Sequence, residues 1–211
     1  MHPEAVLPDI IAGLPLREYT GLLHRLVDFA TLTRYDPMMP LFTLGPGMNG
    51  QRYTPKGGPS ALYAAEDVVT AHAEYHRLDR IVLVADQTFH LVANPTVALT
   101  IQVNLERVLD IADPAIQTAL GTTATELTGP WRKQMIKKVF CPTQVLARAV
   151  YANGTIQGMR YPSARGVEFS NLIMWDERIA PPSFIEVRDT TGTLSARIPP
   201  KRRTRNARLG N

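Results

Sequence analysis

The segment from Leu99 to Glu106 limits how this chain can fold, because it alternates apolar and polar residues without a break. Successive side chains of a β-strand point to opposite faces, so a period of two places one face in the core and the other toward water. The apolar residues here are Leu99, Ile101, Val103 and Leu105. The pattern therefore predicts a strand that is buried on one face.

Several other segments are expected to form strands. Ile81 to Ala85 is a short continuous apolar run, typical of a strand covered on both faces, and Phe89 to Ala93 can follow it in a hairpin through residues 86–88. The Thr191-Gly192 turn predicts that a strand at Leu194–Ile198 pairs with the strand before it. The remaining expected strands are Leu62–Ala65, Ile156–Tyr161, Glu168–Met174 and Phe184–Arg188.

Three segments carry the signals of helices. Asp67 is a good N-cap for a helix from Val68 onward, and the apolar stripe that follows has steps of three and four. Asp113 followed by Pro114 predicts the start of a second helix, which Gly121 can end. A third is expected over Thr143–Tyr151, closed by Asn153-Gly154. The segment Leu16–Leu32 stays open between a helix and a strand.

These elements interleave without regular β–α–β spacing, so we expect an α+β fold with a mixed, mainly antiparallel sheet. With 211 residues and 45% apolar content, the chain can bury a core as a single domain. We place that domain at residues 1–200 and a basic flexible tail at 201–211. The tail holds five of the 23 bases and none of the 19 acids, so the rest of the chain is nearly neutral. A solvated end is the favoured interpretation, and attraction to nucleic acid or an acidic partner is the alternative.

The sequence indicates a cytoplasmic protein. Asp9, Arg17 and His24 interrupt the apolar N-terminal region, and no stretch approaches the roughly 18 to 20 apolar residues of a membrane span. No secretory signal is evident. A single cysteine, Cys141, excludes an internal disulfide and suits a reducing compartment, where it is expected to be a packed residue.

A cation, an aromatic ring and a carboxylate recur at equal spacing in one part of the chain. Arg52, Tyr63 and Glu74 are each 11 residues apart. On the predicted helix Glu74 falls at the edge of the buried face, where a carboxylate can face a cleft. His72 and His76 lie on the far side of that helix and lack the His-Glu-x-x-His order, so no metal site is expected.

These residues belong to longer motifs that together resemble the RES domain, which is named for an arginine, a glutamate and a serine. The resemblance runs from about Leu22 to Asn171 and includes a strand at His24–Val27. The motifs are Gly50-Gln51-Arg52-Tyr53-Thr54-Pro55-Lys56-Gly57-Gly58, Ala61-Leu62-Tyr63-Ala64-Ala65, Ala71-His72-Ala73-Glu74 and Gly158-Met159-Arg160-Tyr161-Pro162-Ser163-Ala164-Arg165.

The resemblance implies a function, a substrate and a partner. RES proteins are toxins of bacterial toxin–antitoxin pairs that destroy NAD, have a fold similar to that of ADP-ribosyltransferases, and are held inactive by an Xre-type antitoxin. NAD would be the substrate and not a cofactor, and no other cofactor is implied. Contact with nucleic acid would be indirect, through the antitoxin, and the resemblance leaves room for a homo-oligomer within the complex.

The chemistry of such a site suggests a role for each candidate residue. Glu74 would stabilise the positive charge that develops on the ribose as the nicotinamide bond breaks. Arg52 would bind the diphosphate, since its planar guanidinium donates paired hydrogen bonds. Tyr63 would stack on nicotinamide, and Ser163 would bind substrate or orient Glu74. Arg25 is a second candidate for the phosphates or ribose, with a structural salt bridge as the equal alternative.

Three functions stay open at this point. The first is cleavage of NAD, with water or inorganic phosphate as the acceptor. The second is ADP-ribosyl transfer to a protein. The third is a non-catalytic module that binds nucleic acid or a partner through the basic tail. The absence of a Gly-x-Gly-x-x-Gly or P-loop motif argues against a redox enzyme or an ATPase.

Overall fold

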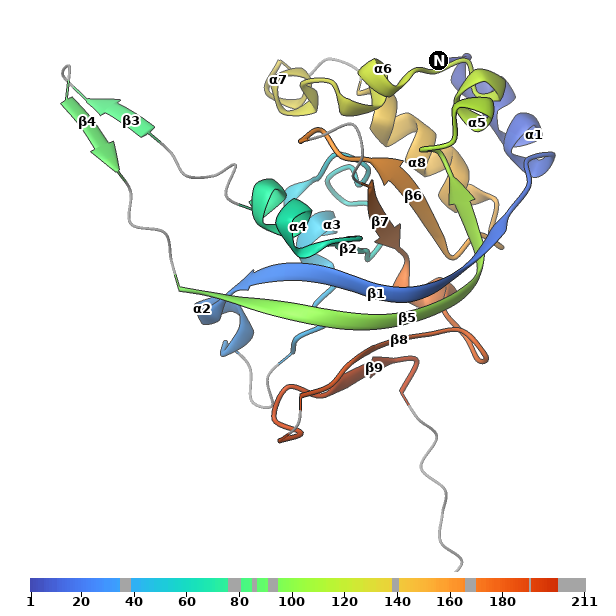
Figure 1. Ribbon diagram of the computed structural model, residues 1–211. Helices are drawn as coiled ribbons and strands as arrows, with labels where there is room; N and C mark the ends of the chain where they lie inside the picture. Colours follow the sequence, from blue (N-terminus) through green and yellow to red (C-terminus); the bar gives the residue numbers. More distant parts are fainter. Residues whose placement is uncertain are drawn as a thin grey trace, which may run out of the picture.

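The computed structural model describes residues 1–34, 39–75, 81–84, 87–90, 95–137, 141–165, 170–189 and 191–200, with only the backbone described for 81–84 and 87–90. The basic tail at 201–211 lies outside these residues. Strands and short helices alternate irregularly along the chain and build one sheet-centred unit (Figure 1). A mixed fold of helices and strands was expected and is confirmed.

The main sheet has seven strands in the order β1-β2-β7-β6-β5-β8-β9, and β1 also pairs with β5. The strands are β1 (Arg17–Asp28), β2 (Leu62–Ala65), β5 (Thr96–Asp110), β6 (Gly158–Pro162), β7 (Ser170–Met174), β8 (Phe184–Val187) and β9 (Ala196–Ile198). The extra pairing closes β1, β2, β7, β6 and β5 into a ring. Within this sheet β5 and β6 run parallel and the other pairs are antiparallel, as predicted.

The two long strands β1 and β5 make up much of this ring (Figure 1). β5 includes the alternating segment, and its apolar residues from Leu99 to Leu105 are buried as predicted. β1 pairs with it from Arg17 opposite Val108 to Asp28 opposite Thr96, with an irregularity at Arg17/Tyr19. The segment Leu16–Leu32, for which the sequence did not decide between helix and strand, is therefore mostly a strand, followed by the short helix α2 (Phe29–Leu32). Its apolar residues resemble a helical stripe because parts of both strand faces are covered: Leu23 and Leu26 point to opposite faces and both are buried.

The two faces of the ring carry separate cores. Inward-facing residues from β1, β2, β5 and β7, among them Leu23, Leu62 and Leu172, pack with one another. Outward-facing residues such as Met159 and Ile173 pack against α1 (Leu7–Ala12) and α8 (Pro142–Ala152). Because strand neighbours alternate between faces, each residue's position in its strand decides which core it joins.

The three predicted helices are present. Asp67 accepts a hydrogen bond from the Thr70 N–H at 2.8 Å and caps α4 (Val68–Tyr75), although the predicted stripe residue Leu78 lies outside the described residues. Asp113 caps α5 (Pro114–Ala119), and Gly121 follows it with a φ of +62°. α8 matches the third prediction to within one residue at each end.

Further short helices were not predicted, because six residues or fewer are too short to show a helical period. They are α1, α2, α3 (Leu44–Asn49), α6 (Ala124–Thr128) and α7 (Trp131–Ile136), with 3₁₀ turns at Glu4–Val6 and Asp176–Arg178. α1, α5, α6, α7 and α8 gather at one end of the molecule (Figure 1). No helix among the described residues is long and apolar enough to cross a membrane.

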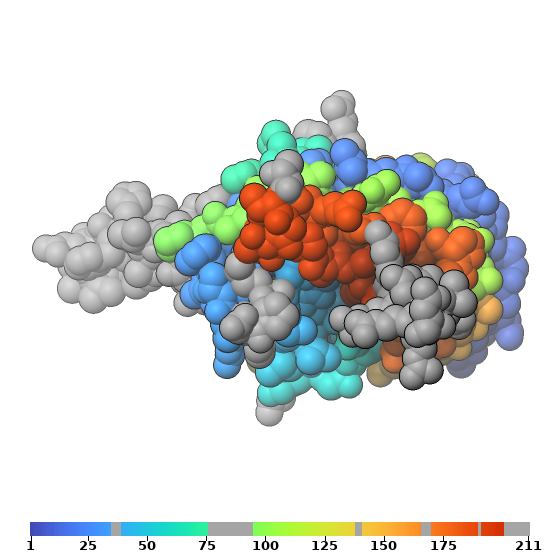
Figure 2. All heavy atoms as spheres, turned by 90° about the horizontal axis from the view of Figure 1, so that it is seen from below, coloured from blue at the N-terminus to red at the C-terminus, as the bar shows by residue number. Residues whose placement is uncertain are grey.

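Both predicted hairpins form. β3 (Ile81–Val84) pairs antiparallel with β4 (Gln87–His90), so the second strand begins two residues earlier than expected, and 91–93 lie outside the described residues. β8 pairs with β9 across the Thr191-Gly192 turn. These two strands belong to the orange-red surface seen from below in Figure 2.

Candidate active site

Helix α4 lies on the outer face of the ring, where it packs across β1 and β2. Leu26, Ala65 and Ala71 form a small buried cluster with Tyr75 against it. The Tyr75 hydroxyl donates to Asp28 Oδ1 at 2.5 Å, and Asp67 caps the other end of the helix. Both ends of α4 are thus held, which fixes the position of Glu74 near its C-terminus.

The Glu74 carboxylate is half-buried and is held through a single oxygen. Ser163 Oγ donates to Glu74 Oε1 at 2.7 Å, and Asn171 Nδ2 donates to the same oxygen at 3.3 Å. Ser163 Oγ accepts the Arg165 N–H at 3.1 Å, which leaves its own hydrogen for Glu74. Ser163 and Asn171 are both buried. No described residue donates to Oε2, the other oxygen of this carboxylate.

Arg52 lies in the loop between α3 and β2 and is 8% exposed. Its Nη1 donates to the carbonyl oxygens of Leu127 at 2.8 Å and Gly129 at 3.0 Å, at the end of α6. Its own carbonyl accepts the Thr143 hydroxyl at 2.7 Å. Among the described residues no carboxylate lies within ion-pair distance of this guanidinium, so its charge is held in place by neutral groups.

Three tyrosines form an aromatic cluster near these two charges. The Tyr53 and Tyr161 rings are 4.4 Å apart, and Tyr63 meets Tyr161 edge-on at 6.5 Å. The Tyr63 hydroxyl shares a 2.7 Å hydrogen bond with Thr54. Burial raises the pKa of all three hydroxyls far above the ordinary tyrosine value, so they are neutral. Arg52 lowers, and Glu74 raises, the pKa of both Tyr53 and Tyr161, which indicates that the two charges border one aromatic cluster.

Arg25 is not part of this cluster. Side chains on β1 alternate between the two faces, so Arg25 points to the inner face with Leu23 and Val27. His24 and Leu26 point to the other face, toward α4. Its Nη1 donates to the Phe42 carbonyl at 3.2 Å, and no carboxylate of the described residues pairs with it. Burial lowers the pKa of Arg25 to about 10, which still leaves it protonated at neutral pH. Of the five predicted site residues, the structure brings together Arg52, Tyr63, Glu74 and Ser163 and separates Arg25.

The structure describes two of the three other residues considered from the sequence, His72 and Cys141. His72 is exposed on α4, and His76 lies outside the described residues. The described part of the chain contains no group of three or more His, Cys, Asp or Glu side chains that could hold a metal. Cys141 is buried, with its sulfur 3.3 Å from the Thr143 hydroxyl, in agreement with a packed residue.

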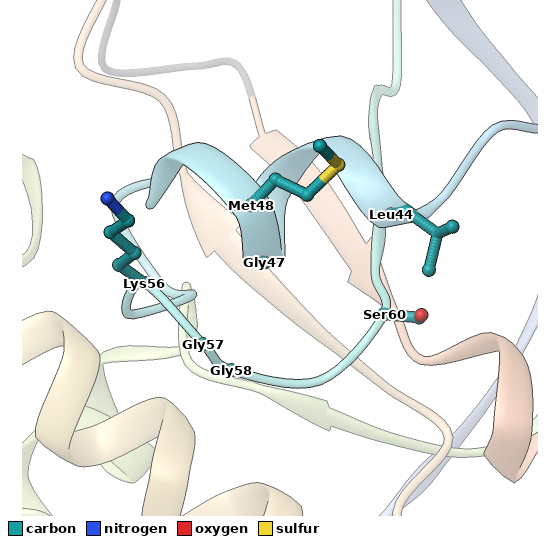
Figure 3. Close-up of a pocket in the computed structure, with 7 residues that line it drawn as sticks. All are labelled: Leu44, Gly47, Met48, Lys56, Gly57, Gly58 and Ser60. Atoms are coloured by element: carbon teal, nitrogen blue, oxygen red, sulfur yellow. The ribbon is translucent and has the colours of Figure 1, made fainter.

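A hollow of about 510 Å³ lies between α3 and the glycine-containing loop that follows Arg52 in the sequence (Figure 3). Its lining consists of Leu44, Gly47, Met48, Lys56, Gly57, Gly58 and Ser60. None of these residues belongs to the Glu74 cluster. A Cβ on Gly47 would stand 2.6 Å from the Gly58 carbonyl oxygen, so this close approach requires glycine and fixes the loop that carries Arg52.

Five contributors to the cluster were not assigned from the sequence. Tyr53 lies next to Arg52, and Tyr161 lies two residues before Ser163, each inside a RES-like motif. Asn171 is a polar residue in an apolar strand. These positions could have marked the three residues as members of the site. The carbonyls of Leu127 and Gly129 gave none, because a backbone group is the same in every residue.

Comparisons with known proteins concern the fold and the family of this chain. A chain in the crystal structure of the M. tuberculosis MbcT-MbcA toxin-antitoxin complex matches with a TM-score of 0.65 and 20% identity, over 87% of this chain and 89% of that one. At this identity the match shows a shared fold. Among curated proteins no match was found. The family model described as the RES domain matches residues 22–195, most of the sequence, and this chain therefore belongs to the RES domain family.

Proposed function

We propose that this protein is the toxin of a toxin–antitoxin pair and that it depletes NAD by cleaving the nicotinamide–ribose bond. Membership of the RES family and the structural similarity to a toxin–antitoxin complex support the first part. The second part depends on one observation. Glu74 presents an oxygen that accepts no hydrogen bond from a described residue, next to an aromatic cluster that also borders Arg52, a cation with no carboxylate partner among those residues.

Glu74 is the catalytic residue of this reaction. When the bond between ribose C1′ and the nicotinamide nitrogen breaks, its electron pair leaves with neutral nicotinamide and positive charge develops on the ribose. The Glu74 carboxylate interacts more favourably with the positively charged ribose of the transition state than with the ribose of the ground state, so it lowers the barrier. An acceptor oxygen then bonds to C1′ and loses its proton. With water this completes hydrolysis, and with inorganic phosphate it completes phosphorolysis.

Arg52 binds the diphosphate. Two of its nitrogen atoms, Nε and Nη2, make no hydrogen bond to a described residue, while Nη1 is held by two carbonyls. A guanidinium fixed in this way can offer its free edge to phosphate oxygens without losing side-chain freedom on binding.

The aromatic cluster receives the nicotinamide, and Tyr63 is half-buried beside it with its hydroxyl tied to Thr54. Ser163 acts through Glu74 and is a positioning residue. Arg25, on the opposite face of β1, supports the Phe42 backbone and takes no part in binding NAD.

An antitoxin of the Xre type is the proposed partner. An enzyme that drains a shared metabolite has to be blocked in the cell that makes it. A partner carboxylate placed on Arg52, which pairs with no carboxylate of the described residues, would neutralise this cation and close the site. Any contact with DNA would be made by this partner. The NAD-consuming reaction places the active protein in the cytoplasm.

Incubation of the purified chain with NAD, with and without phosphate, tests the reaction. We expect free nicotinamide together with ADP-ribose, or with its 1″-phosphate when phosphate is the acceptor. ADP-ribose attached to protein would instead identify a transferase that modifies a macromolecule. Unchanged NAD with all partner protein removed would refute NAD cleavage, whatever the role of the basic tail.

A further inference from the structure

We infer that Asn171 is a positioning residue that selects which oxygen of Glu74 acts on the substrate. The inference rests on the proposed NAD cleavage. Its starting point is that both hydrogen bonds to Glu74 end on Oε1, from Ser163 at 2.7 Å and from Asn171 at 3.3 Å. Two donors on one oxygen fix the rotation of the carboxylate, and Oε2 is then turned away from its protein partners.

Asn171 is the more rigid of the two donors. It lies in β7 between β2 and β6, paired with Ala65 on one side and Tyr161 on the other, and is 4% exposed. Ser163 follows the end of β6, in a loop. A central strand moves less than a loop, so the position of Glu74 relative to the tyrosine cluster is set mainly by Asn171.

An amide and a carboxylate at this position would act differently on Glu74. The amide Nδ2 donates a hydrogen to Oε1, which suits a carboxylate oxygen because such an oxygen only accepts. An aspartate at this position has the same shape but places a second carboxylate about 3.3 Å away, and two such groups share one proton.

The test compares Asn171→Asp and Asn171→Leu with the wild type and with Asn104→Asp. Asn104, on β5, accepts a hydrogen bond from the Thr20 hydroxyl of β1 and lies outside the Glu74 cluster, so Asn104→Asp controls for an added negative charge on the sheet. Initial rates of nicotinamide release give kcat and KM from pH 5 to 9. Calorimetry gives NAD binding, and thermal unfolding reports the fold.

For Asn171→Asp we expect kcat at pH 7 to fall about 100-fold, KM to change less than about threefold, and the acid limb of the kcat profile to move up by about one pH unit or more. Asn171→Leu should lose a similar factor in kcat with its profile unmoved, because it removes the donor without adding a charge. Asn104→Asp should match the wild type in all three.

Retention of wild-type kcat and pH profile by a folded Asn171→Asp protein would overturn the inference while NAD cleavage by the wild type stands. A loss of activity in Asn171→Asp that follows a lower unfolding temperature, with no shift in the profile, would also overturn it, since a structural role predicts that result. If Asn171→Leu does not fold, Asn171→Asp alone decides. If the wild type leaves NAD intact, the proposed function fails and the inference with it.

Discussion

Two groups of charges lie on opposite faces of the same strands, and their partners differ in kind. On the outer face, Glu74 is held by the hydroxyl of Ser163 and the amide of Asn171, and Arg52 is held by backbone carbonyls. On the inner face, Arg160 is held by other charges: it donates to both oxygens of Glu66, at 2.7 and 2.8 Å, and to Asp110 at 3.2 Å.

The inner network continues beyond Arg160. Asp110 also meets Arg17 at 3.5 Å, and Arg17 donates to Asp113 at 2.7 Å. Its carboxylates raise the pKa of Arg160 further, and burial followed by the charge of Glu66 raises the pKa of Tyr19 to about 12. These charges link β1, β5, β6 and the end of β2, and each cation is paired with two carboxylates.

The two groups of charges therefore serve different purposes, one in stability and the other in the proposed chemistry. A charge paired with its opposite contributes to the fold and has little left for a ligand. A charge held by neutral groups keeps its full field in a place where water is scarce, which is the arrangement that favours binding and transition-state stabilisation. On this basis we propose that the substrate binds at the outer face, although Arg160 on the inner face and Tyr161 on the outer face are neighbours in sequence.

The largest effect is expected from Glu74→Gln, which keeps the shape and both donors but removes the charge. NAD cleavage should fall by about 10³-fold or more, while the unfolding temperature changes little, because no opposite charge loses a partner. The matched control is Glu66→Gln, whose charge is paired with Arg160. It should lower stability and leave kcat within a few-fold. If Glu66→Gln removed activity and Glu74→Gln did not, the comparison would be reversed.

Arg52→Lys should have the next largest effect. A lysine keeps the charge but lacks the planar fork, so it cannot bind both carbonyls and a phosphate together. We expect kcat/KM for NAD to fall about 10- to 100-fold, mainly through KM. Arg25→Lys is the control, and it should leave kcat/KM nearly unchanged because Arg25 faces the inner side. An equal loss in both variants would place Arg25 in the site and refute the assignment by strand face.

Strand alternation, helix caps and turns were predictable because each depends on residues close in sequence. Closure of the ring was not, since β1 pairs with two strands that lie about 40 and 80 residues away in sequence. The cluster was predictable as far as its side chains belong to motifs. The position of Arg25 could be predicted only once β1 was known to be a strand. Alternation of side chains along a strand then places Arg25 on the same face as Leu23 and Val27.

Arg160→Met tests the inner face by its stability. Removal of the guanidinium leaves Glu66 and Asp110 without their shared partner. Because Arg160 is 28% exposed, water recovers part of the loss, and we expect a decrease of about 2 kcal/mol in the free energy of unfolding. Denaturant unfolding measures it. The remaining folded protein should keep NAD cleavage within a few-fold, and a loss as large as that of Glu74→Gln would show that the two faces are not separate.

The smallest effect concerns Asp67, a charge outside both groups that caps α4. Partial burial acts to raise the pKa of Asp67, but hydrogen bonds from the Thr70 hydroxyl and backbone N–H groups outweigh it and lower the pKa. Because the folded value is depressed, the cap stabilises the protein above the ordinary aspartate pKa of about 4 and is lost as pH falls through the folded value. Asp67→Ala should therefore cost about 1 kcal/mol at pH 7 and progressively less in acid. Denaturant titrations at pH 7 and 3 measure the contribution of this cap to stability. Since α4 is also held at Tyr75, NAD cleavage should persist, and its loss in Asp67→Ala would instead make Asp67 a third member of the site.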